Sequence, residues 1–363
     1  MRITVLGAGY MGSAMALVAR GCGHEVKLWG TWLDDDLLAP CERGEAHPRL
    51  KLPLSGPTPP KAGLSGPTPP KAGLPDLALY RAPRLAEALR DAEIIIFGVN
   101  SDGAIEVTKR ATDAAREIIT RVPILSVTKG LLVNAAGKMD RIDAVLSEVV
   151  GHPLRFVHAA GPAKAMEIAR GVLTWMAFAG APEDAEPCRA ALAGKHMHIT
   201  TTTDRTGAEL CSALKNAYAT GLGLWDGLIG IDAHDARAAC FTQSILEMRR
   251  LVTAGGGLAD TVYGPAGIGD LHVTGAGGRN RAFGERVGRG RPAGEVAREM
   301  LAAGELTEGY PAIATASRFA RERGVTPLPL LDALHAIIWQ DAPVRETLAG
   351  LRLDSAPPVP SST

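Results

Sequence analysis

The sequence predicts an α/β domain with a mostly parallel sheet, followed by a second domain made only of helices. Short apolar, β-branched runs alternate with helical patterns through residue 203, which is typical of parallel strands buried on both faces. A glycine-rich turn directly follows the first of these runs. Beyond residue 203 the strand pattern stops, and helical patterns rich in Ala, Leu and Glu continue to about residue 349.

The composition fits two globular domains and argues against several classes of function. The chain has 363 residues, 46% of them apolar, and its 39 Lys and Arg balance 39 Asp and Glu. Such a chain has no global basic field to bind nucleic acid or an anionic membrane. Five cysteines without CxxC spacing indicate reduced thiols and no metal site. With neither a signal peptide nor an apolar run of about eighteen residues, we expect a cytoplasmic protein without integral membrane contact.

The first domain is expected to span residues 1–203. Each of its strands is a run rich in Val, Ile or aromatic residues that ends at a turn. The last strands are joined by shorter connections, and we expect them to run antiparallel. The predicted strands lie at 3–7, 25–30, 92–99, 123–130, 155–162, 173–180 and 196–202.

A proline-rich tandem repeat interrupts this domain. The ten residues LSGPTPPKAG occur at 54–63 and again, letter for letter, at 64–73. Their proline density excludes a helix or a central strand. We expect a surface insertion, with a polyproline II ligand for a partner protein as the alternative.

The second domain is expected to span residues 204–349. Thr206 and Glu209 have the spacing of a capping box, which predicts a helix start there. A glycine-rich stretch at 255–290 breaks the helical patterns. The residues from 350 to 363 have neither periodicity nor apolar mass, and we expect a disordered tail.

The turn after the first strand has the GxGxxG pattern of a dinucleotide site. Gly7 allows a tight turn, Gly9 lets the main chain approach a pyrophosphate, and Gly12 permits close helix packing. The following helix offers free amides to an anion. A Rossmann-type first domain that binds a dinucleotide is therefore predicted.

The sequence leaves the choice between NAD and NADP open. The second strand ends in Leu28-Trp29-Gly30-Thr31, without the acidic residue that binds a ribose diol and without an arginine for a 2′-phosphate. Three aspartates at 34–36 come a few residues late. They could serve NAD, or they could simply begin a helix.

Three features of the second domain fit one kind of chemistry when they are taken together. Lys215 lies at the edge of an apolar helical stripe, Asp270 and Thr274 follow a glycine-rich turn, and Arg279 follows Gly277-Gly278. Singly, these would be an exposed lysine, a helix cap and a basic turn. Together they provide a lysine to transfer a proton, an aspartate to position it and an arginine for an anionic substrate. Lys129 follows a strand at the carboxyl edge of the sheet, where ligands of such folds bind, and is a plausible neighbouring cation.

Over roughly residues 1–345 the sequence resembles the NAD(P)-dependent glycerol-3-phosphate dehydrogenases. The resemblance rests on an ordered series of motifs rather than on any single one. These are GAGYMG at the start, HPRL at 47–50, SVTKG with Lys129, GPAKAMEIARG at 161–171, LKNAYA with Lys215, GIGDLHVT with Asp270 and Thr274, GGRNRAFGERVGRG, and the TEG triplet that ends at Gly309.

The resemblance implies an activity and a role for each matching residue. It implies reversible hydride transfer between NAD(P)H and dihydroxyacetone phosphate, which gives sn-glycerol 3-phosphate for phospholipids, in a homodimer whose helical domain is like that of 6-phosphogluconate dehydrogenase. Lys215 would be the general acid or base, Lys129 would stabilise charge at the carbonyl, and Asp270 and Thr274 would orient Lys215 and the substrate. The implied substrate-binding residues are Lys129, Gly161, Asn216, Arg279 and Asn280. The implied cofactor-binding residues are Gly7, Gly9, Tyr10, Met11, Gly12, Trp29, Lys129, Arg279 and Glu308.

Three departures and two alternative functions accompany the resemblance. The duplicated proline-rich insertion lies outside the family core. Ala163 stands where bacterial members usually have a hydroxyl residue, and Gly278 replaces a common serine. A related two-domain reductase of a 2-keto or 3-hydroxy acid is the nearest alternative, although Lys129 and Arg279 favour a doubly charged phosphate. A non-catalytic sensor that binds NAD(H) is the alternative from another class.

Overall fold

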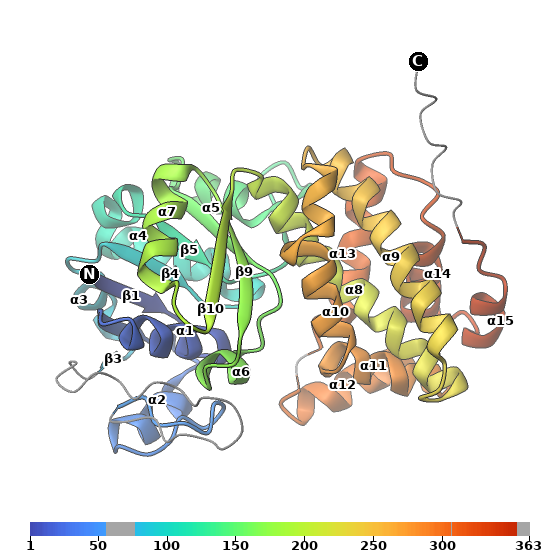
Figure 1. Cartoon of the computed structure of the whole chain (residues 1–363), viewed down its shortest axis with the longest axis horizontal. Coiled ribbons are helices and arrows are strands. Elements are labelled where there is room, and N and C mark those ends of the chain that lie inside the picture. The colour runs from blue at the N-terminus through green and yellow to red at the C-terminus, as the bar shows by residue number, and fades with distance from the viewer. Residues whose placement is uncertain (56–76, 306, 354–363) are drawn as a thin grey trace. The chain divides into compact units, whose positions relative to one another are not determined.

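The computed structural model describes residues 1–55, 77–305 and 307–353, which belong to two compact units (Figure 1). The units are Met1–Glu209 and Leu210–Thr363. From residue 56 onward the predicted proline-rich insertion lies outside the described residues, as does the predicted tail from residue 354. Within the described residues, no helix is both long and apolar enough to span a bilayer.

The first unit is built on a mostly parallel sheet, as predicted. Its strand order in the described part of the chain is β10-β9-β8-β5-β4-β1-β2-β3 (Figure 1). All neighbours from β8 to β3 pair in parallel, β9 is antiparallel to β8, and β10 is parallel to β9. The last two strands therefore reverse direction together. The strands are β1 (Arg2–Leu6), β2 (Glu25–Trp29), β3 (Ala78–Tyr80), β4 (Ile94–Phe97), β5 (Ile124–Ser126), β8 (Phe156–Ala160), β9 (Thr174–Ala179) and β10 (Met197–Thr202).

Helices cover both faces of this sheet because successive strand residues point to opposite sides. In β4, Ile94 and Ile96 pack into one core while Ile95 and Phe97 pack into the other. The first core includes α1 (Tyr10–Gly21), α2 (Asp35–Glu42), α6 (Ala165–Ala169) and α7 (Pro182–Leu192). The second includes α3 (Leu85–Leu89), which follows η1 (Ala82–Arg84), together with α4 (Ser101–Arg121) and α5 (Ile142–Val150).

Sequence patterns missed three short strands in this unit. Strand β3 adds three residues to the edge of the sheet beside β2, and β6 (Leu131–Val133) and β7 (Met139–Arg141) form an antiparallel hairpin. Asn134 accepts hydrogen bonds from the amides of Ala136 and Lys138 and so closes the hairpin turn. Three residues are too few for a period of two to be visible in a sequence.

The predicted capping box at Thr206 and Glu209 is wrong. Helix α8 (Arg205–Ile229) already includes both residues, and the Asp204 carboxylate accepts the amide of Gly207 at 2.9 Å. The Thr206 hydroxyl instead accepts a hydrogen bond from Arg141, and Glu209 accepts the amide of Asp143. Both side chains therefore bind a neighbouring segment rather than the start of their own helix. The division between the units falls within α8, after Glu209.

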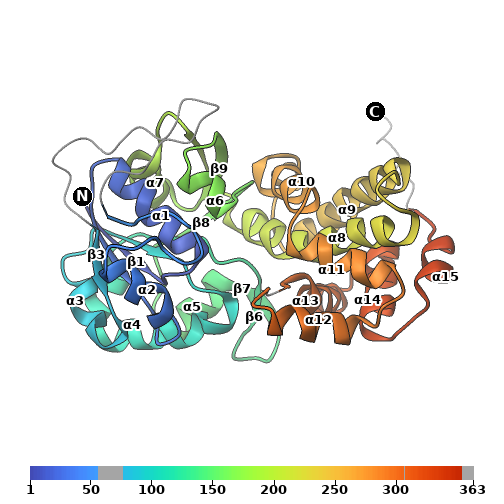
Figure 2. The same cartoon turned by 90° about the horizontal axis from the view of Figure 1, so that it is seen from below.

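All regular elements in the described part of the second unit are helices, and the glycine-rich stretch at 255–290 separates α9 from the short elements η2, η3 and α10 and from α11. A Cβ atom at Gly223 or Gly227 of α8 would collide with the backbone of α11, and one at Gly284 or Gly288 of α11 with that of α8 (Figure 2). Here the glycines mark a close helix crossing rather than a loop. The helices after α8 are α9 (His234–Ala254), η2 (Ala259–Tyr263), η3 (Pro265–Gly269), α10 (Asp270–Gly275), α11 (Arg279–Gly288), α12 (Ala293–Ala302), α13 (Gly309–Glu322), α14 (Pro329–Trp339) and α15 (Val344–Ala349).

Candidate active site

The glycine-rich turn between β1 and α1 is tightly packed. Gly7 has a φ of +104°, and a Cβ at Gly12 would collide with the carbonyl oxygen of Gly7. Gly98, which follows β4, also packs here, since its Cβ would lie 2.8 Å from the Cα of Gly12. Sequence analysis did not identify Gly98, because a lone glycine after a strand is an ordinary turn residue. The three glycines hold the main chain in a shape that side chains would prevent.

The start of α1 is open to a ligand. Gly9 is the N-cap residue and no side chain caps the helix. A Cβ built on Gly9 would have one atom within 4 Å, a guanidinium nitrogen of Arg49 at 3.7 Å. The central carbon of the Arg49 guanidinium lies 5.7 Å from the centre of the exposed Tyr10 ring. Uncapped amides beside an arginine suit a pyrophosphate. The residues present therefore fit a dinucleotide, and Arg49 joins the candidates.

Two buried side chains hold the backbone of the glycine-rich turn in place through hydrogen bonds to Ala8. His47 accepts the amides of Arg49 and Leu50 on Nδ1, and its Nε2 lies 2.9 Å from the carbonyl oxygen of Ala8. Burial lowers the pKa of His47, so the ring is neutral and Nε2 donates to that oxygen. Asp34 accepts the amide of Thr31 at 2.8 Å and that of Ala8 at 3.3 Å. Asp34, the first of the three aspartates considered for the ribose, thus holds the turn.

Lys129 and Gly161 follow two neighbouring parallel strands, β5 and β8, at their carboxyl ends. Lys129 is half-buried, and Gly161 is buried with a φ of +126°. Thr128, beside Lys129, donates to the carbonyl oxygen of Val99 at 2.7 Å and ties this end of β5 to that of β4. The two residues therefore lie on the edge of the sheet where ligands of open α/β folds bind.

Trp29 differs from the other predicted cofactor residues because its side chain belongs to the core. The ring is 1% exposed, and its Nε1 donates to the carbonyl oxygen of Ala82 at 3.2 Å. A contact between Trp29 and a cofactor would have to use the backbone. Met11 is partly buried and packs against the core on the other face.

In the second unit Lys215 is buried among polar partners instead of reaching water at the edge of the apolar stripe. Its Nζ lies 2.6 Å from Oδ1 of Asp270 and 2.9 Å from Oγ1 of Thr274. The side chains of Lys215 and Asp270 are only 9% and 1% exposed. Asp270 and Thr274 are one turn apart on α10, and they therefore face the same point on α8.

The next residue on α8 organises a second network. Asn216 donates to Glu308 and accepts from Asn280, each at 2.9 Å. The other end of the Asn280 amide accepts the backbone N–H of Gly309 at 2.9 Å. Three of the predicted site residues are thus brought together, and each asparagine is fixed at both its oxygen and its nitrogen.

Arg279 and Arg281 have different surroundings, although they are close in sequence. Arg281 is bound to the buried carboxylate of Asp226 at 2.5 Å, and Asp226 also pairs with Arg237 at 2.6 Å. Arg279 is exposed at the first turn of α11, and its side chain forms no hydrogen bond or ion pair with the residues that the structure describes. The anchored arginine fixes the helix, and Arg279 remains available to an anion.

These features fit a class of protein: two-unit oxidoreductases that use a nicotinamide dinucleotide. Comparison with known proteins identifies the family within this class. Residues 70–186 match the family model for the NAD-dependent glycerol-3-phosphate dehydrogenase N-terminus, and residues 204–349 match that for the C-terminus. The chain belongs to the NAD-dependent glycerol-3-phosphate dehydrogenase family.

Individual relatives agree over almost their whole length. The glycerol-3-phosphate dehydrogenase [NAD(P)+] of Leuconostoc citreum is 30% identical over 96% of this chain and 96% of its own length. The NADP(+)-dependent glycerol-3-phosphate dehydrogenase of Archaeoglobus fulgidus is 29% identical over 96% of this chain and 98% of its own length. The crystal structure of glycerol-3-phosphate dehydrogenase from Coxiella burnetii, 28% identical, superposes with a TM-score of 0.77 and covers 96% of this chain and 97% of that one.

Proposed function

We propose that this chain interconverts dihydroxyacetone phosphate and sn-glycerol 3-phosphate with NAD(P)H, and that it supplies glycerol 3-phosphate for phospholipid synthesis. The observation that carries the proposal is the buried Lys215, held by Asp270 and Thr274. A lysine placed in this way suits proton transfer to a carbonyl oxygen better than it suits a protein that only binds a nucleotide. Family membership supports the same reaction.

A nicotinamide held at this site would supply the hydride for the proposed reduction of the substrate carbonyl. Lys215 supplies the proton, so that the carbonyl gains one hydride and one proton and becomes an alcohol. An ammonium group has three N–H donors. Asp270 and Thr274 accept two of them, which directs the third to the substrate oxygen. In the oxidation, the neutral amine of Lys215 takes the proton back.

The cofactor is assigned to the glycine-rich turn of the first unit. Gly7, Gly9 and Gly12 shape the turn, and the amides of Tyr10 and Met11 at the start of α1 face the pyrophosphate. Arg49 adds a positive charge beside Gly9. Glu308, oriented by Asn216, is assigned to the nicotinamide end.

The groups assigned to substrate binding are two cationic side chains and two oriented amide side chains. Arg279 binds the phosphate, and Lys129 stabilises negative charge at the carbonyl. Asn216 and Asn280 each have a second N–H donor beyond the bond that fixes them, and this donor is available for a substrate hydroxyl. Gly161 contributes its backbone.

The deciding experiment compares dihydroxyacetone phosphate with dihydroxyacetone, each with NADH and with NADPH, by following the absorbance of the reduced cofactor. We expect turnover only with the phosphorylated ketone, and the faster cofactor identifies the preference. Equal turnover without the phosphate would contradict the assignment of Arg279. A folded protein that binds the cofactor without turning over either ketone would instead favour a keto-acid reductase or a sensor.

The location and assembly of the protein are also proposals. All five cysteines are free thiols, and four of them are buried, which fits the reducing cytoplasm. A homodimer is proposed by analogy with the family, and light scattering at several protein concentrations would test it.

A further inference from the structure

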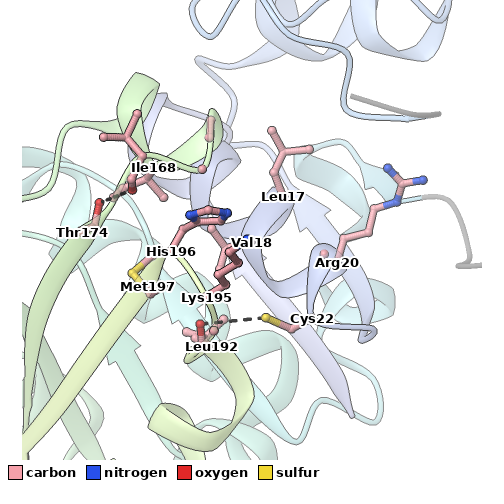
Figure 3. Close-up of a pocket in the computed structure, with 15 residues that line it drawn as sticks. Leu17, Val18, Arg20, Cys22, Ile168, Thr174, Leu192, Lys195, His196 and Met197 are labelled. Carbon is pink, nitrogen blue, oxygen red and sulfur yellow. Dashed lines mark hydrogen bonds between the residues drawn. The ribbon is translucent and has the colours of Figure 1, made fainter. Parts of the chain in front are cut away.

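The first unit contains an apolar cavity at the opposite end of α1 from the glycine-rich turn. Its volume is about 170 Å³. One wall is the last two turns of α1, from Leu17 onward, and the others are residues 168–174 at α6 and β9 and residues 192–197 at α7 and β10 (Figure 3). None of these residues belongs to the nucleotide or proton-transfer sites described above.

The interior of the cavity suits an aliphatic chain. Leu17, Val18, Ile168, Leu192 and Met197 supply its apolar surface. An apolar cavity of roughly 150 Å³ accepts a benzene-sized molecule, and this one therefore has room for about six to eight carbons. Beside it, Val172 and Leu173 are 37% and 69% exposed, which extends the apolar surface outward.

Apart from Cys22 and Thr174, the polar side chains that line the cavity are basic. Arg20, Lys195 and His196 line it, and no Asp or Glu does so among the described residues (Figure 3). The Nε2 atom of His196 is shielded from solvent and has no hydrogen-bond partner in the described part of the chain. A buried ring nitrogen without a partner is costly, and a ligand oxygen would satisfy it.

Two exposed glycines, Gly21 and Gly194, are among the residues that line the cavity. A Cβ built on Gly21 or on Gly194 meets no atom within 4 Å, and neither residue has a positive φ. Ordinary side chains are therefore compatible with the backbone at both positions and would fill space that is now open.

We propose that this cavity binds an amphipathic anion, a chain of about six to eight carbons that ends in a carboxylate or a phosphate. The aliphatic part of the ligand lies against Val18, Ile168 and Met197, and its anionic head accepts hydrogen bonds from His196 and Lys195. A carboxylate and a phosphate both accept hydrogen bonds from these basic side chains, and comparing the binding of the two ligands distinguishes them.

The test titrates the full chain with octanoate and with octyl phosphate by calorimetry, with octan-1-ol and octylammonium as the uncharged and oppositely charged probes. We expect saturable binding of at least one anion with a dissociation constant of about 1 mM or tighter, and binding of the alcohol and the amine at least tenfold weaker. The tighter anion identifies the head group. Absence of saturable anion binding, or equal binding of the amine, would overturn the proposal.

Variants locate the binding. Gly21→Leu and Gly194→Leu each add a bulky side chain at a residue that lines the cavity and should weaken binding at least tenfold, whereas Ala114→Leu, on the exposed surface of α4, should leave it unchanged. Lys195→Ala with His196→Ala should weaken the anion at least tenfold and leave the alcohol unaffected. Melting curves establish that each variant is folded. Unchanged binding in both glycine variants, or competition between the anion and NADH, would place the ligand elsewhere and refute the assignment.

Discussion

Gly309→Ala tests whether the backbone at the start of α13 determines the geometry around Asn216. In the structure a Cβ at Gly309 would collide with the hydroxyl oxygen of Thr220 and would lie 3.0 Å from the carbonyl oxygen of Asn216. The start of α13 would have to move outward. The amide of Gly309 would then lose its bond to Asn280, and Glu308 its bond to Asn216.

The expected loss of stability follows from these contacts. Overpacking costs roughly 1 to 3 kcal/mol. The lost bond of the buried Gly309 amide costs about 0.5 to 1.5 kcal/mol, and the bond of the exposed Glu308 side chain adds little. Alanine regains about 1 kcal/mol over glycine in a helix. We expect a net loss of about 1 to 3 kcal/mol in the free energy of unfolding, measured by urea titration, together with lower turnover.

Two further variants make the reasoning refutable. Gly294→Ala, in α12, is the matched control: its Cβ meets nothing closer than 3.9 Å, so it should stabilise the protein by about 0.5 to 1 kcal/mol. Thr220→Ala removes the closest obstacle and should recover about 1 kcal/mol or more of the loss in the double variant. If Gly309→Ala were as stable as the parent, or if Thr220→Ala gave no recovery, the packing argument would be wrong.

Three other predictions follow from the site and its surroundings. Lys215→Met combined with Asp270→Asn, which leaves no unpaired buried charge, should lower kcat by roughly two to four orders of magnitude and retain nucleotide binding; unchanged kcat would remove Lys215 from the mechanism. Arg279→Ala should raise KM for dihydroxyacetone phosphate by about 10- to 100-fold without a change in melting temperature, and a change in cofactor affinity alone would show that Arg279 does not bind substrate. Burial raises the pKa of Glu209, so the folded chain retains a proton that the unfolded chain loses, and stability should fall as pH rises above the ordinary range of a glutamate. Glu209→Gln should flatten that decline above the ordinary pKa of a glutamate, about 4.3, and an unchanged pH dependence would show that Glu209 is not its source.

Much of the first unit could be predicted from sequence because its signals are local. Buried strands appear as continuous apolar runs, and the turn at Gly7 lies between a strand and a helix, as the dinucleotide motif requires. Strand β3 and the hairpin β6–β7 were missed because three residues carry no visible periodicity. The supporting roles of His47 and Asp34 depend on contacts with Ala8, which is distant from both in sequence.

The second unit shows why sequence position alone misjudged Lys215. Helical periodicity placed it at the edge of an apolar stripe, where a lysine ordinarily extends to solvent. The packing of α10 against α8 covers that edge and supplies Asp270 and Thr274 as partners. Periodicity describes one helix at a time, and it cannot show which other helix will lie against the edge of the stripe.

The glycine contact between α8 and α11 has a consequence for how the site tolerates change. Each helix carries two glycines at a spacing of four, Gly223 and Gly227 on one and Gly284 and Gly288 on the other. Each glycine destabilises its helix by about 1 kcal/mol relative to alanine. The close crossing therefore forms although its glycines weaken both helices. Small-residue contacts of this kind are common between helices in bilayers, where backbones approach closely. The distance from Asn216 to Asn280 is thereby set by main chain against main chain, and repacking of nearby apolar side chains leaves that distance unchanged.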